Sequence, residues 1–317
     1  NNTAMEPYRA FVADKLDEAQ QPIGFQAQSF FTGFGQTLAN VSLFVFPMIF
    51  IGTTGKLPTW VFASFILGSI CSIGSVWWSS YTTKEIPPTE EELQKIQSEK
   101  VNIFTPFIDI FLAIKEMPKV MWQLALVYLF QWYALFCYWQ NSSKSIALSV
   151  WNTTPQQNSK LYEEAVGWTG LVNGWYNIVT FLCAFGLVYF AKKYSPKMVH
   201  FACLLLAATG FLIFPHIENK YLLFPAITGF GIGWASMMGI PYLMVVNNIP
   251  KERYGVYMGI INMMIVIPMF IQTITFGYIM KHFLHNDPRL AITFAGVLLV
   301  LAAVFTLSIS TKKAVNE

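Results

Sequence analysis

Amide and aromatic side chains occur together within apolar stretches of the sequence, and this combination suits the binding of a polyhydroxylated ligand. Amides donate and accept hydrogen bonds with hydroxyls, while aromatic rings stack on the C–H face of a sugar. Two simpler roles compete with binding, because Trp and Tyr anchor membrane interfaces and Asn and Gln join neighbouring helices. The candidates for ligand binding are Gln131, Trp132, Asn173, Tyr176, Asn177, Trp234 and Asn262.

Charged side chains near apolar stretches form a second group of candidates. A charge at the centre of a membrane helix costs about 2.5–3.5 kcal/mol on insertion scales, so charges in such places are usually functional. Glu6 and Arg9 are three residues apart near the end of an apolar stretch, a spacing at which they can pair on one helix face. The pair fits two roles, a gating or coupling pair or an interfacial ion pair that fixes a loop.

The composition indicates that these residues belong to a membrane protein. Of the 317 residues, 55% are hydrophobic and only 12% are charged, whereas a soluble domain carries about 25% charged residues. Such a chain cannot cover its surface with polar side chains, so lipid must be its solvent. The net charge of +3 is small and spread over loops, which argues against nucleic acid as a partner.

Eight apolar stretches are long enough to cross the membrane as helices, for which roughly 20 residues are needed. Their predicted limits are 26–52, 59–81, 118–139, 166–190, 198–215, 221–246, 255–280 and 289–310. We therefore expect an all-α polytopic membrane protein. The residues up to about Ala13 look like the last turns of another helix, so we expect the chain to be incomplete at its N-terminus.

The basic residues predict the orientation of these helices, because Lys and Arg in short loops stay on the cytoplasmic side. In the predicted topology, fourteen of the 20 Lys and Arg residues fall on one side and six on the other. The C-terminus lies on the first side and is expected to be cytoplasmic. The expected location is the plasma membrane or a bacterial inner membrane.

In the polar stretch 82–117, Phe104, Phe107, Ile108 and Phe111 recur at helical spacing and predict an amphipathic interfacial helix.

Several further expectations concern single residues. Tyr138 and Trp139 lie near the outer end of their predicted helix and are expected to anchor it at the interface. His200 is expected to be interfacial, and Asn141 starts a glycosylation sequon in a predicted outer loop. The three glycines in 229–233 have no strand before them and no Lys-Ser or Lys-Thr after them, so they predict close helix packing or bending and not a phosphate loop.

A same-sense repeat relates the two ends of the chain. The matching positions, at identical spacing, are Pro7-Tyr8, Asp14 and Glu18 in one copy and Pro241-Tyr242, Asn248 and Glu252 in the other. Duplicated halves of this kind are typical of major facilitator transporters. We expect the remainder of an N-terminal helix bundle in 1–81, a cytoplasmic connector in 82–117 and a six-helix C-terminal bundle in 118–317.

Longer motifs surround both copies of the repeat. They are Asn1-Asn2, Pro7-Tyr8-Arg9-Ala10 and Ala13-Asp14 in the first, and Gly233-Trp234-Ala235, Gly239-Ile240-Pro241-Tyr242 and Glu252-Arg253-Tyr254-Gly255-Val256-Tyr257-Met258-Gly259 in the second. They resemble the fourth helix, and the tenth and eleventh helices, of sucrose-type and glycoside–pentoside–hexuronide:cation symporters. The resemblance covers nearly the whole chain and implies a major facilitator fold of two helix bundles, with helices four to twelve present.

The resemblance also implies roles for the charged candidates. Arg9 and Asp14 match the loop motif that latches the cytoplasmic side of these symporters during alternating access. Glu252 and Arg253 would be the equivalent latch in the second half. Proton coupling is implied by the resemblance alone, because the predicted helices from residue 118 onward have no acid in their middle turns.

The expected function is secondary active transport of a sugar, a di- or oligosaccharide, by alternating access. The expected partners are the sugar, protons and the lipid bilayer, with a monomeric protein and no cofactor or metal. Two alternatives stay open: a carrier for another polar metabolite, and a transporter-like sensor that binds without translocating. A membrane-embedded enzyme is not expected, because no His-Asp or paired-carboxylate spacing supplies a catalytic group.

Overall fold

The computed structural model describes residues 21–55, 57–84, 90, 93, 105–246, 249 and 254–310. The predicted gating and coupling residues all lie outside these ranges, and the structure therefore does not test them: Glu6, Arg9, Asp14, Glu252 and Arg253.

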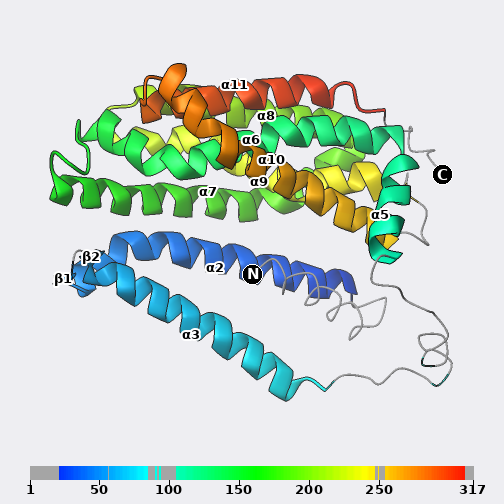
Figure 1. Ribbon diagram of the computed structural model, residues 1–317, viewed down its shortest axis with the longest axis horizontal. Helices are drawn as coiled ribbons and strands as arrows, with labels where there is room; N and C mark the ends of the chain where they lie inside the picture. The colour runs from blue at the N-terminus through cyan, green and yellow to red at the C-terminus, as the bar shows by residue number, and fades with distance from the viewer. Residues whose placement is uncertain are drawn as a thin grey trace.

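Long helices running side by side make up most of the described chain (Figure 1). In chain order the elements are α2 (Gln21–Ile49), β1 (Thr53–Thr54), β2 (Leu57–Pro58), α3 (Thr59–Thr82), α5 (Thr105–Lys115), α6 (Lys119–Val150), α7 (Ser159–Lys193), α8 (Pro196–Ile213), η1 (Phe214–His216), η2 (Lys220–Leu222), α9 (Leu223–Val246), α10 (Tyr254–His282) and α11 (Pro288–Thr306). The two short strands pair as an antiparallel hairpin between α2 and α3.

The apolar character of the helices matches a membrane environment. Six of them, α3, α6, α8, α9, α10 and α11, are long and apolar enough to cross a membrane. In α2 the described residues add a shorter apolar stretch, Gly33–Ile49. Each of the eight predicted spans overlaps one long helix, so the prediction of an all-α polytopic membrane protein is confirmed. A helix also forms at Thr105–Lys115 in the predicted connector.

Helix α6 differs from its prediction, because it continues past the expected end at residue 139 to Val150. The polar run that begins at Gln140 predicts an outer loop. Instead, these side chains are accommodated within the helix: the amide of Asn141 donates a hydrogen bond to the carbonyl oxygen of Cys137 at 2.9 Å. Asn141 is only 5% exposed. Its sequon therefore lies in a packed helix and not in a loop.

The helices α6 to α11 pack into one bundle, in which α11 lies against α6 and α8, and α9 lies against α7 and α8. Glycines allow the close approach of α9 to its neighbours. A Cβ atom added to Gly229 would collide with the backbone of α8, and one added to Gly231 would lie 2.7 Å from the carbonyl oxygen of Tyr176. A Cβ on Gly233 would lie 2.6 Å from that of Ala207. The prediction of close helix packing at 229–233 is confirmed.

Helix α2 lies along α7, while α3 diverges from α2 and contacts little else (Figure 1). The contact between α2 and α7 is again made at glycines. A Cβ on Gly170 would overlap the carbonyl oxygen of Asn40 and lie 2.7 Å from the Cβ of Leu43. In contrast, no residue in the described range of α3 is buried.

We name the two ends of the bundle after the elements that lie there. The hairpin end carries β1 and β2 together with the loops at 151–158 and 283–287, and the α5 end carries helix α5 (Figure 1). Helices α6 and α10 both run from the α5 end to the hairpin end.

One predicted interfacial residue, His200, lies inside the bundle. It is fully buried. Its Nδ1 atom is 2.8 Å from the hydroxyl oxygen of Ser236, on α9. The expectation was wrong because α8 and α9 approach closely enough to enclose this side chain between them.

Candidate functional site

Aromatic rings from α6, α7 and α9 meet in the interior of the bundle. The ring centres of Trp132 and Trp234 are 5.8 Å apart and the rings are nearly perpendicular, and the ring centre of Trp139 is 5.6 Å from that of Trp234. Tyr176 joins the group through Phe230, whose ring centre is 4.7 Å from that of Tyr176 and 6.3 Å from that of Trp234. The structure thus brings together three predicted binding residues, Trp132, Tyr176 and Trp234.

Buried polar atoms without hydrogen-bond partners lie beside this aromatic group. Gln131 is completely buried, and neither atom of its amide has a partner within the described part of the chain. The same is true there of the hydroxyl of Tyr128 and the indole N–H of Trp132. An unpaired buried group costs about 1–3 kcal/mol. These three residues, which we call the α6 polar cluster, are therefore places where a water molecule or a polar ligand would be stabilised.

The two predicted asparagines on α7 have partners of their own. The hydroxyl of Tyr138 donates to the side-chain oxygen of Asn173 at 2.8 Å, and the amide of Asn177 donates to the backbone oxygen of Asn173 at 2.8 Å. Tyr138 is fully buried and stacks on Phe211 with ring centres 4.5 Å apart. Tyr138 is therefore a core residue that joins α6 to α7, and not the interfacial anchor that was expected.

The remaining predicted binding residue, Asn262, is half-buried on α10. That helix packs mainly against α6. Asn262 thus belongs to a different helix pair from the aromatic group, whose rings come from α6, α7 and α9.

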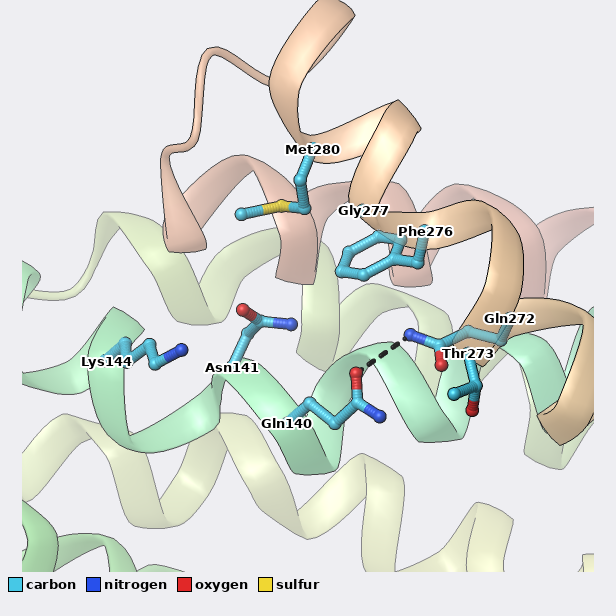
Figure 2. A pocket seen from close by; sticks show the side chains of 8 residues that line it. All are labelled: Gln140, Asn141, Lys144, Gln272, Thr273, Phe276, Gly277 and Met280. Carbon is cyan, nitrogen blue, oxygen red and sulfur yellow. Dashed lines mark hydrogen bonds between the residues drawn. The ribbon is translucent and has the colours of Figure 1, made fainter.

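A cavity of about 330 Å³ lies between α6 and α10. We call it the α6–α10 cavity. It is lined by Gln140, Asn141, Lys144, Gln272, Thr273, Phe276, Gly277 and Met280. The buried amide of Gln272 donates to the side-chain oxygen of Gln140 at 3.1 Å, as Figure 2 shows. The oxygen of Gln272 has no partner within the described residues. The cavity is thus polar on its α6 side and partly apolar on its α10 side.

The long apolar helices and the duplicated motifs agree with a comparison of the sequence with protein families. Residues 24–273 match the model of the Major Facilitator Superfamily. The chain belongs to the major facilitator superfamily. No curated protein matches the sequence significantly.

Family membership fixes the general class of this major facilitator protein. Proteins of this superfamily are typically secondary transporters and not enzymes, and the apolar helices make this chain a multi-pass membrane protein. Polar groups buried between its helices are therefore candidates for parts of a transport pathway.

The lining of the α6–α10 cavity in this major facilitator protein was not among the predicted sites. Gln140 stands out in the sequence as a polar residue beside the aromatic cluster of its helix, but Asn141 and Lys144 were missed because the polar run predicts the end of the helix. A signal was present in the sequence: polar or sulfur-containing residues at 137, 140, 141 and 144 keep the three- and four-residue spacing of one helix face. Gln272 also stands out as a polar residue of an apolar stretch, but its pairing with α6 was not predicted, because a single amide in an apolar helix does not indicate which neighbour it faces.

Proposed function

We propose that this protein is a secondary active transporter of a sugar, a di- or oligosaccharide, that works by alternating access and is coupled to protons. The observation that supports a sugar most directly is the α6 polar cluster. Gln131 has a buried amide without a partner among the described residues, and Trp132, the next residue along α6, packs its ring against Trp234. A sugar could use the amide as donor and acceptor, the indole N–H as donor, and the ring faces for stacking.

The proposed site is closed in this structure. Gln131 is 0% exposed, Trp132 5% and Trp234 8%. Entry of a sugar thus requires a movement that separates α6 from α9 or opens a path along α6. Alternating access supplies such a movement through rocking of two bundles, here the bundle within 1–81 and the bundle within 118–317, joined by the connector 82–117. The glycine contact between α2 and α7 is then a surface along which the two parts move.

The orientation and the coupling complete the proposal. The α5 end and the C-terminus are assigned to the cytoplasm on the distribution of basic residues. The resemblance of their motifs to those of sucrose-type symporters supports a gating or coupling role for Arg9, Asp14, Glu252 and Arg253, and Glu6 is spaced to pair with Arg9. Proton coupling itself rests on that resemblance.

The test is counterflow in proteoliposomes that contain the purified protein and are loaded with unlabelled sucrose or maltose. Labelled sugar outside should enter transiently above equilibrium, and Trp132→Ala should abolish this overshoot. Trp122→Ala is the matched control, because Trp122 is on the same helix and is 54% exposed. Counterflow of a nucleoside but of neither sugar would indicate a carrier for another polar metabolite. Sugar binding without counterflow would indicate a sensor.

A further inference from the structure

We propose that the α6–α10 cavity is a binding site for a small hydroxylated carboxylate, separate from the sugar site at the α6 polar cluster. The two places lie on different faces of α6: Trp132 and Trp139 pack against Trp234 of α9, while Gln140 bonds Gln272 of α10. This inference goes beyond the proposed sugar transport and concerns a different ligand.

The charge of the cavity points to an anion. Lys144 is its one ionic lining residue, and none of the lining residues is acidic. Its side chain extends toward Asn141 in Figure 2. The ion pairs found within the described ranges join Lys220 to Glu164 and Arg289 to Asp287, and do not include Lys144. An ammonium beside neutral amides is best satisfied by a carboxylate, through charge-assisted hydrogen bonds.

The hydrogen-bonding groups point to hydroxyls on the same ligand. Gln272 is completely buried, and its side-chain oxygen is an acceptor without a donor in the described structure. One N–H of the Asn141 amide donates to the backbone oxygen of Cys137, and the side-chain oxygen of Asn141 is a second acceptor. A bare carboxylate cannot donate to these oxygens, whereas hydroxyl groups can. The cavity therefore needs a ligand with both an anionic group and donors.

The cavity opens to the surface of the bundle, where Gln140 and Lys144 are exposed, and its volume suits a small molecule. A volume of about 330 Å³ is at the low end of the range of ligand pockets, which runs from about 300 to 1,000 Å³. Phe276 and Met280 supply an apolar wall for the carbon chain. A Cβ atom at Gly277 would have no neighbour within 4 Å, so this side of the cavity is open space. A larger residue at 277 would fill the cavity without disturbing the helices.

The competing explanation is that Lys144 is simply a lysine whose long side chain reaches water at the membrane surface. The two explanations differ in what happens when the charge is removed. A surface lysine can be replaced without affecting any ligand. A lysine that binds a carboxylate cannot be replaced by a neutral residue, although arginine should substitute for it in part.

The experiment measures binding to the purified protein by isothermal titration calorimetry, with gluconate, glucose and acetate as probes. Gluconate carries both a carboxylate and hydroxyls, glucose lacks the charge, and acetate lacks the hydroxyls. We expect gluconate to bind at least 10-fold more tightly than either. Lys144→Gln should weaken gluconate binding by about 10- to 100-fold, as expected for a hydrogen bond to a charged group, and Lys144→Arg should stay within a few-fold of the original protein.

Two further variants make the result decisive. Lys160→Gln removes an exposed lysine at the start of α7 that does not line the cavity, and it should leave gluconate binding unchanged. Gly277→Leu should abolish binding by filling the cavity, while the protein still elutes as a single folded species. Gluconate binding no tighter than that of glucose, or unaffected by Lys144→Gln and Gly277→Leu, would overturn the proposal.

The outcome is independent of sugar transport. Gln131→Leu should remove sucrose counterflow and leave gluconate binding intact, whereas Lys144→Gln should remove gluconate binding. A protein that binds gluconate through Lys144 but carries no sugar would refute the proposed function and support the cavity assignment. The reverse result would refute the cavity assignment alone.

Discussion

At the scale of single residues, the main feature is that two of the three glutamines of α6 have opposite surroundings. Gln131 is buried without partners in the described part of the chain. Gln123 is fully satisfied: its amide donates to the backbone oxygen of Ser308 at 2.7 Å, and its oxygen accepts from the backbone N–H of Ser310 at 2.9 Å. Gln123 therefore joins α6 to the end of the described chain after α11, whereas Gln131 contributes no hydrogen bond within the described residues.

This contrast predicts opposite effects of the same substitution. Gln131→Leu removes an unpaired buried amide and should raise the stability of the ligand-free protein by about 1–3 kcal/mol, while sugar counterflow is lost. Gln123→Leu removes satisfied hydrogen bonds and should lower the melting temperature. Thermal unfolding of the two variants in detergent checks this prediction. A lower melting temperature for Gln131→Leu would mean that the amide has a partner and is structural.

Asp287, in the loop before α11, predicts a pH-dependent contribution to stability. Its carboxylate caps α11 by accepting from the backbone N–H of Arg289 at 2.8 Å, and the guanidinium of Arg289 contacts it at 2.7 Å. Burial alone would raise the pKa of Asp287, but the hydrogen bonds and charge of Arg289 outweigh it, so the pKa is lowered.

Because the folded pKa lies below the unfolded one, this contribution is fully present above the unfolded pKa, near 3.9 for a free Asp, and is lost as the pH falls through the folded pKa. Asp287→Ala should cost about 1 kcal/mol at pH 7, as is typical for an N-cap. The difference in melting temperature between the variant and the original protein should shrink in strongly acidic buffer. A difference that is the same at every pH would contradict the role of the charge.

At the scale of elements, the contact between α2 and α7 depends on the absence of a side chain. Gly170→Ala would place a Cβ atom against the backbone of Asn40, and overpacking of this kind costs about 1–3 kcal/mol. The variant should lose stability and sugar counterflow together. Gly186→Ala on the same helix is the control, because nothing lies within 4 Å of its added Cβ. Equal behaviour of the two variants would show that α2 and α7 do not pack closely in the membrane.

The positions of the helices could be predicted from the sequence, because they depend on the length of each apolar stretch. The errors concern features that depend on packing between helices. All eight spans overlap a helix because a run of about 20 apolar residues has few alternatives in lipid. The end of α6 was placed too early because polar residues were equated with a loop. Tyr138 and His200 were placed at interfaces because a sequence does not show which helices will enclose a residue.

The candidate site was predicted less completely than the fold, for the same reason. Trp132, Tyr176 and Trp234 do come together, since amides and rings in neighbouring helices tend to face the bundle interior. The α6–α10 cavity depends on the relative rotation of two helices, and no local pattern at Gln272 encodes that rotation. A site formed across helices requires the packing to be known.

At the scale of the whole molecule, this member of the major facilitator superfamily has polar and aromatic side chains in its interior and no acid in the middle turns of α6 to α11. A sugar suits such an interior because it needs hydrogen bonds and ring faces and no countercharge. The proposed proton coupling rests on the resemblance of the loop motif that contains Arg9.

The most direct test of this account is uptake of labelled sucrose and maltose into proteoliposomes across an imposed pH gradient. The account predicts accumulation above the equilibrium level, collapse of that accumulation when a protonophore is added, and its loss in Arg9→Ala with the protein still folded. Folded protein that takes up neither sugar, with or without the gradient, would contradict the central claim.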